Sequence, residues 1–229
     1  MLEIRQATQR GSANFGWLKS RHTFSFGSYY DPAQMGFSVL RVINDDVVTP
    51  GAGFDTHGHK DMEILSLVLE GSIAHKDSAG NTEVLPAGEY QLMSAGRGIY
   101  HSEFNASNKD TLRFLQIWLL PDSTGGEPGY QQKSFGEQPG LTLILSPDGR
   151  GGSLKLKQNA LLYQLILPMA EQLELPLQPK RNAYVHLISG ELELNGQQLQ
   201  PGDGVKVNAE QLLQMRAVSA VKALIFDLP

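Results

Sequence analysis

Short apolar runs, most of them bounded by turn-forming residues, constrain the fold of this chain more than any other feature. Gly, Pro, Asn or Asp bounds most of these runs, and no segment has a long apolar period of 3.6 residues. This spacing is typical of an all-β sandwich or barrel. The runs cover residues 40–43, 63–69, 90–93, 112–120, 141–145, 161–167, 184–188 and 223–226. We therefore expect an all-β fold with a few short helices as additions, one of them near residues 32–35.

Two parts of the chain share a pattern of turns. Residues 69–72 (LEGS) followed by 86–89 (PAGE) resemble residues 188–191 (ISGE) followed by 201–204 (PGDG). Each pattern reads as a strand, a Gly turn, a hairpin and a Pro-containing turn into the next strand. Gly and Pro punctuate any β protein, so chance similarity is the alternative. The pattern predicts two copies of one β unit, joined by the Gly/Pro-rich stretch 121–140.

Two pairs of potential metal ligands stand in the first copy. His57 and His59 are two residues apart, as are His101 and Glu103, and such pairs share one face of a strand. On neighbouring antiparallel strands inside a barrel, they would offer three nitrogens and one carboxylate oxygen. This set suits divalent iron, manganese, nickel, copper or zinc. Glu63, four residues after His59, competes with Glu103 as the oxygen ligand.

The chain contains no cysteine, so any metal must be held by nitrogen and oxygen atoms. The second copy lacks the ligands, because the positions that correspond by counting from its turns are Pro176, Gln178, Met215 and Ala217. We therefore expect the second copy to be structural.

Several other polar residues are weaker candidates. We expect the remaining histidines to be packed or exposed and not to bind metal; they are His22, His75 and His186. Gln116 stands in an otherwise apolar run, where its side chain needs a partner, and a place in the metal pocket would supply one. Lys60 and Arg97 flank the ligand motifs and could attract an anionic substrate, although such charges are usually solvated.

Charge and hydropathy exclude two classes of partner. The net charge of −5 comes from interspersed residues of both signs, and no Lys/Arg-rich block is present, so we expect no direct nucleic-acid binding. No run approaches the roughly 18 apolar residues of a membrane span, and the first residues lack a signal-peptide core, so we expect no membrane insertion. These features and the absence of cysteine predict a cytoplasmic protein.

The motifs resemble those of the pirins, a family within the cupin superfamily. The resemblance is carried by residues 17–18 (WL), 22–26 (HTFSF), 30–32 (YDP), 57–63 (HGHKDME), 86–88 (PAG) and 95–103 (AGRGIYHSE), and by 145–149 (LSPDG) with 152–153 (GS). It extends over nearly the whole chain.

The resemblance implies a bicupin fold of two cupin β-barrels. The N-terminal metal-binding cupin domain would cover residues 1–125, and a C-terminal cupin domain without metal ligands would cover 126–229. The ligands would be His57, His59, His101 and Glu103, which favours Glu103 over Glu63. The family implies one divalent ion, usually Fe(2+), with zinc, manganese, nickel, cobalt or copper as alternatives.

The resemblance also implies a function. Bacterial members most like this chain resemble quercetin 2,3-dioxygenases, which open the central ring of a flavonol with O2 and release carbon monoxide. Glu103 would then be the catalytic proton acceptor, and Gln116 would line the pocket of an aromatic, flavonol-like substrate. One alternative is an iron-containing, redox-sensing regulator that binds a protein partner, such as a transcription factor or a metabolic enzyme. Another is a different cupin activity on a small oxygenated substrate.

Overall fold

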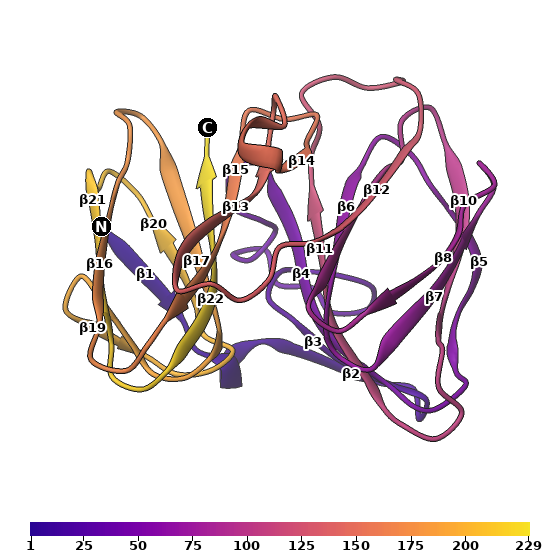
Figure 1. Ribbon diagram of the computed structural model, residues 1–229, viewed down its shortest axis with the longest axis horizontal. Helices are drawn as coiled ribbons and strands as arrows, with labels where there is room; N and C mark the ends of the chain where they lie inside the picture. Colours follow the sequence, from indigo (N-terminus) through magenta and orange to yellow (C-terminus); the bar gives the residue numbers. More distant parts are fainter. The chain divides into compact units, whose positions relative to one another are not determined.

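The computed structural model describes residues 1–229, which are built almost entirely from β-strands (Figure 1). The helical elements are two short 3-10 turns, Ala7–Gln9 and Arg150–Gly152. The expectation of a short helix near residues 32–35 is wrong. There the Asp31 backbone oxygen accepts a hydrogen bond from Gln34 N and its carboxylate accepts one from Ala33 N, which closes a single turn. No helix is long and apolar enough to cross a membrane.

Contacts divide the chain into two compact units, and neither is one continuous stretch. The N-terminal unit contains Gly11–Gly136 and Leu156–Gln158; the C-terminal unit contains Met1–Arg10, Glu137–Lys155 and Asn159–Pro229. The first ten residues join the C-terminal unit because β1 (Leu2–Arg5) pairs with β20 (Gly204–Val207). The two predicted domains, 1–125 and 126–229, were continuous stretches of the chain. Contact grouping gives discontinuous units and does not test that boundary, which stays a prediction.

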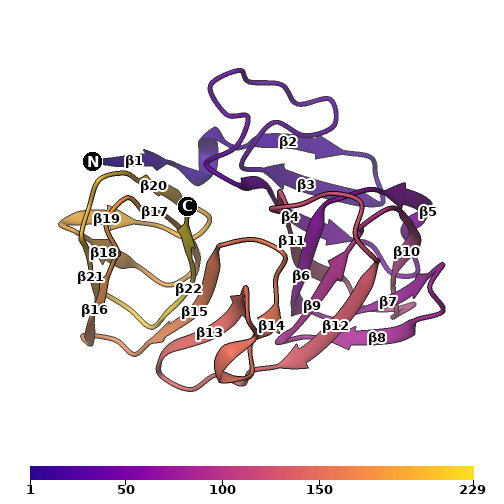
Figure 2. The ribbon, with the colours of Figure 1, turned by 90° about the horizontal axis from the view of Figure 1, so that it is seen from above.

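The N-terminal unit consists of two antiparallel sheets, whose strands can be followed in Figure 2. The orders are β12-β9-β6-β11-β4-β3-β2 in the seven-stranded sheet and β5-β10-β7-β8 in the four-stranded sheet. The strands are β2 (Gly11–Asn14), β3 (Leu18–His22), β4 (Leu40–Val48), β5 (Gly53–His59), β6 (Glu63–Glu70), β7 (Ser72–Asp77), β8 (Thr82–Pro86), β9 (Glu89–Ser94), β10 (Ile99–Asn105), β11 (Leu112–Leu119) and β12 (Gly129–Ser134).

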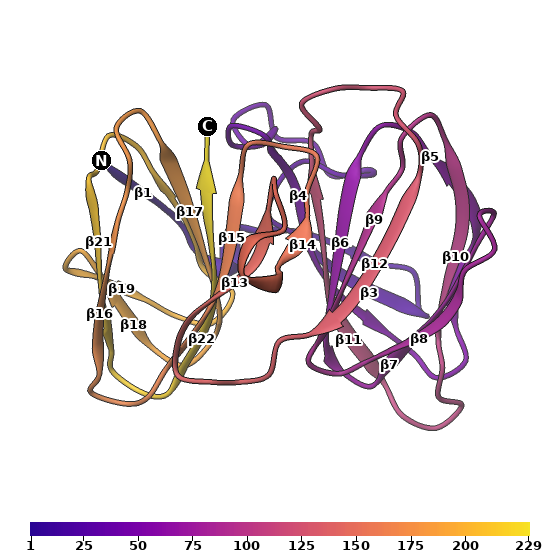
Figure 3. The same cartoon turned by 45° about the horizontal axis from the view of Figure 1, so that its top comes forward.

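The C-terminal unit has the same division into two sheets (Figure 3). The orders are β1-β20-β17-β22-β15-β13-β14 and β16-β21-β18-β19. The remaining strands are β13 (Gly140–Ser146), β14 (Leu154–Lys155), β15 (Leu161–Leu167), β16 (Gln172–Pro176), β17 (Asn182–Ser189), β18 (Leu192–Leu194), β19 (Gln197–Leu199), β21 (Leu212–Ala217) and β22 (Val221–Leu228).

The predicted all-β class is confirmed, and the apolar runs have a common place in it. Each of the eight runs coincides with a strand that has a neighbour on both sides in a seven-stranded sheet. These strands are β4, β6, β9, β11, β13, β15, β17 and β22. These strands are paired on both edges, and most of their side chains are buried, as in the pattern BBBBBBie of β6. Burial on both faces explains why they appear in the sequence as nearly continuous apolar runs.

The structure supports the predicted duplication. The orders β5-β10-β7-β8 and β16-β21-β18-β19 correspond strand by strand. Gly71 and Gly190 occupy equivalent turns with φ values of +80° and +82°. A Cβ atom would lie 2.9 Å from the Thr111 backbone oxygen at the first turn and 2.0 Å from that of Ala220 at the second. Both turns therefore need glycine, for its left-handed conformation and for the close backbone approach.

The C-terminal unit replaces the potential ligands with core residues. Met215 on β21 lies opposite Leu173 on β16, as His101 lies opposite His57 in the N-terminal unit. Met215, Leu173 and Ala217 all belong to one hydrophobic cluster. Both groups of potential metal ligands in the chain lie in the N-terminal unit.

Gly53 allows β5 and β10 to approach closely. A Cβ atom at Gly53 would lie 2.3 Å from the Glu103 backbone oxygen and 2.5 Å from the Phe104 Cα atom. We expect Gly53→Ala to separate the strands and to lower the free energy of unfolding by about 1–3 kcal/mol in urea titrations. Gly129→Ala is the control, because the nearest atom to its new Cβ would be 3.9 Å away. Equal stability of the two variants would contradict this reading of the pairing.

Candidate metal centre

Three imidazoles converge from two neighbouring strands. His57 and His59 occupy alternate positions on β5, and the antiparallel register sets His101 of β10 directly opposite His57. Ring centroids are 4.5 Å apart for His57 and His101, 4.8 Å for His57 and His59, and 4.9 Å for His59 and His101. One potential ligand atom from each ring lies within 4.8 Å of the other two. The structure therefore brings three of the four predicted ligands together, and Glu103 lies outside this group.

The hydrogen bonds leave nitrogen lone pairs facing this meeting point. His57 Nδ1 lies 2.7 Å from the Asp55 backbone oxygen, which can only accept, so Nδ1 donates to it and Nε2 is the nitrogen that faces the other rings. His57 Nε2 lies 3.1 Å from His101 Nε2. His59 Nε2 is buried without a hydrogen-bond partner. A metal ion would engage these atoms and remove the cost of the orphaned nitrogen.

Burial keeps two of these rings neutral. Desolvation, with a further contribution from nearby His57, lowers the pKa of His59 to about 4. The same two causes, with His59 adding to them, lower the pKa of His101 to about 3. Metal ligation requires the neutral imidazole, so both rings are in the binding form at neutral pH without losing a proton.

Glu103 lies in the interior next to the histidines. A bulge in the β5–β10 pairing falls between His101 and Glu103. The Glu103 carboxyl is 3% exposed; Gln116 Nε2 donates to its Oε2 at 2.9 Å, and Ser66 Oγ to its Oε1 at 3.4 Å. Burial raises the pKa of Glu103 to about 7, and Asp46 adds to this against the two hydrogen bonds. This carboxyl can therefore hold or release a proton near neutral pH.

Glu63, the competing oxygen ligand, is engaged elsewhere. Its Oε2 accepts hydrogen bonds from Ser94 Oγ at 3.0 Å and from the Lys157 backbone nitrogen at 3.2 Å. It belongs to neither group of converging ligand atoms. The geometry favours Glu103, which shares such a group with His101 and His75.

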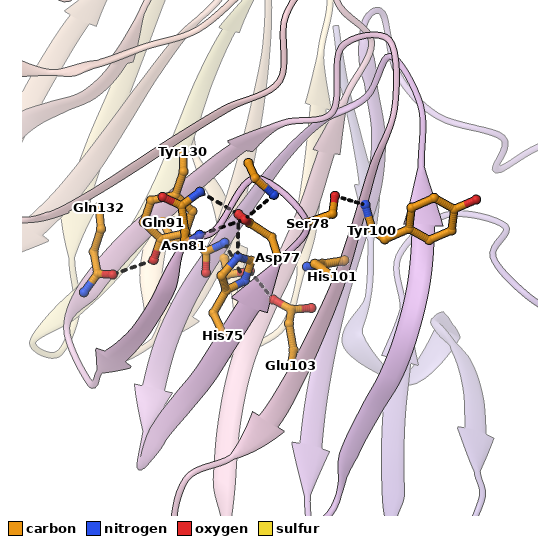
Figure 4. A network of polar contacts seen from close by, with 12 residues as sticks. His75, Asp77, Ser78, Asn81, Gln91, Tyr100, His101, Glu103, Tyr130 and Gln132 are labelled. Carbon is orange, nitrogen blue, oxygen red and sulfur yellow. Dashed lines mark hydrogen bonds and ion pairs between the residues drawn. The ribbon is translucent and has the colours of Figure 1, made fainter.

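His75 is packed, as expected, but it lies beside the centre (Figure 4). It stands on β7 opposite Glu103, and its ring centroid is 5.4 Å from that of His101. Its Nε2 contacts Asp77 Oδ2 at 3.2 Å, and its Nδ1 lies 3.3 Å from Gln91 Nε2. Both ring nitrogens thus have protein partners, whereas His59 Nε2 has none. This difference favours His59 over His75 as a ligand.

A row of buried polar side chains runs across the seven-stranded sheet of the N-terminal unit. Residues directly opposite on neighbouring antiparallel strands share one face. The register pairs one residue on each of β3, β4, β11, β6 and β9 in this way, in the order His22, Asn44, Gln116, Ser66 and Gln91. Two of them, Gln116 and Ser66, donate hydrogen bonds to Glu103, and Gln91 contacts His75, which lies beside the centre.

A cavity of about 590 Å³ adjoins the imidazoles of His57 and His59. Five Phe and Trp side chains form part of its wall: Phe15, Trp17, Phe26, Phe54 and Trp118. The polar lining includes Ser20, His22, Asn44, Asp46 and Gln116. The size and the mixture of aromatic walls with a few polar groups suit a planar aromatic ligand.

The structure locates the weaker candidates. Gln116 lines the cavity, and its orientation is fixed because its Oε1 accepts from Trp118 Nε1 at 3.3 Å while its Nε2 donates to Glu103. Lys60 is exposed, and Arg97 pairs with Glu127 at the surface, so neither lines the cavity.

Several buried polar residues were not identified from the sequence, among them Ser66, Gln91 and Asp46. Ser66 and Gln91 are polar residues in otherwise apolar runs, the same signal that identified Gln116. Asp46 follows the apolar run at 40–43 and is also buried. Each of these residues is polar in or beside an apolar run, where a buried strand would ordinarily have apolar side chains.

Comparisons with known proteins place this site in a class. The pirin family model matches residues 3–119, and a model described as the quercetinase C-terminal cupin domain matches residues 143–228. The crystal structure of the bacterial pirin YhhW from Escherichia coli in complex with nickel(II) is 48% identical, with a TM-score of 0.98, and the match covers 100% of this chain and 99% of that chain.

Curated relatives agree. A quercetin 2,3-dioxygenase of Escherichia coli strain K12 is 49% identical over 100% of this chain and 99% of its own length. A pirin-like protein of Caulobacter vibrioides is 36% identical over 99% of each chain. Together, the fold and the matches show a protein with two cupin domains. The histidine cluster and the nickel complex of the relative support a single divalent metal ion. The chain belongs to the pirin family.

The raised pKa of Glu103 predicts how its replacement changes stability with pH. A group whose pKa is higher in the folded state stabilises the fold when protonated, and this contribution disappears as pH rises from 4.5 through about 7. We compare the free energy of unfolding of the metal-free wild type with that of metal-free Glu103→Gln. The wild type minus the variant should be roughly 2 kcal/mol larger at pH 5 than at pH 8.

Urea titrations at both pH values measure this difference. The histidines are common to both proteins, so their titration cancels in the comparison. Glu127→Gln, at an exposed site, is the control. A difference between wild type and Glu103→Gln that stays constant with pH would contradict the buried, protonated carboxyl.

Proposed function

We propose that this protein is a metal-dependent dioxygenase that opens the central ring of a flavonol such as quercetin with O2 and releases carbon monoxide. The observation that carries the proposal is the convergence of three imidazoles beside a cavity whose wall includes five Phe and Trp side chains. The 49% identity with a relative named quercetin 2,3-dioxygenase supports the same reaction. O2 and an aromatic flavonol are the proposed substrates, and Fe(2+) is the proposed native ion.

His57, His59 and His101 would hold the ion through their nitrogens, with Glu103 as the fourth ligand. The chemistry of this donor set suits a divalent transition metal. When bound, the ion supplies positive charge that favours the deprotonated 3-oxygen of a flavonol.

Glu103 is the residue that we propose to accept the proton of the 3-hydroxyl. Gln116 can only donate through Nε2, so the carboxyl keeps Oε2 as an acceptor and takes the proton at Oε1. The neighbour of Oε1 is the Ser66 hydroxyl, which can turn from donor to acceptor when that proton arrives.

The cavity supports the binding of a planar ring system. Trp118 and Phe26 meet edge to face, with ring centroids 5.3 Å apart, as do His59 and Trp118 at 5.0 Å. Aromatic walls in contact with one another form a rigid surface that excludes water and orients an aromatic ligand.

The activity test uses protein loaded anaerobically with Fe(2+), to which quercetin and air are added. We expect loss of the flavonol absorbance together with carbon monoxide release. His59→Ala should lose both bound iron and turnover. Glu103→Gln should keep most of its iron but lower kcat by about 10²-fold or more, because the amide cannot accept the proton.

Glu127→Gln is the matched control and should behave like the wild type, because its side chain is exposed. Full activity of Glu103→Gln would remove Glu103 from proton transfer. No flavonol loss despite stoichiometric iron would reject the dioxygenase and favour the regulatory alternative.

A further inference from the structure

Asp46 is a buried carboxyl on the cavity wall that the proposed reaction leaves without a role. It stands on β4, is 2% exposed, and lies opposite Ser20 of β3 and Phe114 of β11. Ser20 hydrogen-bonds to this carboxyl, but Asp46 Oδ1 is buried without any partner. Such an unpaired polar atom costs free energy in the folded protein, so it calls for a ligand or another explanation.

The neighbouring Asp45 illustrates the difference between the two faces of β4. Both oxygens of Asp45 accept from Arg113, Oδ1 from Nε at 3.0 Å and Oδ2 from Nη2 at 3.1 Å. Asp45 therefore has a complete structural explanation in the protein itself. Asp46 lines the cavity that also contains His57 and His59, whereas Asp45 does not.

We propose that Asp46 Oδ1 binds a phenolic hydroxyl of the substrate other than the one held at the metal centre. This assignment rests on the proposed function, because it takes a polyhydroxylated aromatic compound as the substrate. Asp46 would then act as a specificity-determining residue that distinguishes hydroxylated from unsubstituted rings.

A hydroxyl is the group that this carboxyl matches in either protonation state. Burial raises the pKa of Asp46 to about 7, with Ser20 opposing and Asp45 adding to the rise. An ionised carboxyl accepts from a hydroxyl, and a protonated one donates to it, because the hydroxyl oxygen offers both a donor and acceptors. An anionic group would be repelled by the ionised form, and the ionised form of nearby Glu103 would add to that repulsion.

The surroundings agree with a ring that carries the hydroxyl. Ser20, His22 and Asn44 line the same cavity, and His22 Nδ1 lies 2.8 Å from Asn44 Oδ1 and 3.3 Å from Ser20 Oγ. These three side chains already have partners among themselves. Asp46 Oδ1, by contrast, is buried without a partner and could form a hydrogen bond with a ligand.

The test measures binding without turnover. Wild type and Asp46→Ala, each loaded with Fe(2+), are titrated anaerobically with quercetin and with 3-hydroxyflavone, which keeps the flavonol oxygens but lacks the other hydroxyls. Trp17 and Trp118 both line the cavity and are the two tryptophans of the chain, so quenching of their fluorescence reports occupancy. Asp45→Asn is the control on the opposite face of β4.

We expect Asp46→Ala to raise the Kd of quercetin about tenfold and to change that of 3-hydroxyflavone less than about twofold, since one hydrogen bond to a buried group is lost. Asp46→Asn, which is nearly isosteric, should recover part of the preference through its amide. Asp45→Asn should bind both compounds like the wild type.

Two results would overturn the assignment. If the wild type binds and consumes quercetin but Asp46→Ala and Asp46→Asn both keep the wild-type ratio of the two Kd values, Asp46 does not bind a hydroxyl, and the dioxygenase proposal survives. If the iron-loaded wild type binds neither flavonol, the proposed function fails and this assignment fails with it.

Discussion

The antiparallel pairing of β5 with β10 is the constraint on which the rest of the site depends. Its register sets His101 opposite His57, and the alternation along β5 turns His59 to the same side. Gly53 permits the close approach of the two backbones, since a Cβ there would collide with Glu103 and Phe104. A slip by one residue would turn every one of these side chains to the opposite face.

Desolvation then sets the charge state of the interior. Burial lowers the pKa values of His59, His75 and His101, and it raises those of Asp46, Glu63 and Glu103. Burial thus disfavours the charged form of each of these groups, because the charged form loses more hydration than the neutral one. Neutral imidazoles can bind a metal ion, and a carboxyl near its pKa can exchange a proton.

Much of this arrangement could be predicted from the sequence, because the strands buried on both faces leave continuous apolar runs. The four-stranded sheets left no such runs, since strands such as β5 and β16 alternate between half-buried and exposed residues. The spacing of His57, His59, His101 and Glu103 revealed the motifs. The packing of His75 beside His101 depends on the pairing of β7 with β10, which no local pattern encodes.

The same limit applies to the polar residues of the larger sheet. Gln116 was identified because a polar side chain in a buried strand needs a partner, but its partner, Glu103, lies on the other sheet. Counting residues from the turns pointed to Pro176 in the second copy, whereas strand register sets Leu173 opposite Met215. The distance from the shared turn differs between the two copies, so counting residues does not find the equivalent strand positions, whereas the strand register does.

We propose that one divalent ion binds among His57, His59 and His101, with Glu103 as the fourth ligand. Anomalous diffraction from crystals of the iron-loaded protein, collected at the iron absorption edge, locates the ion directly. We expect one peak within bonding distance of His57 Nε2, His59 Nε2 and His101, with Glu103 as the carboxylate ligand. A peak instead among His75, His101 and Glu103, the other group of converging ligand atoms, would contradict it.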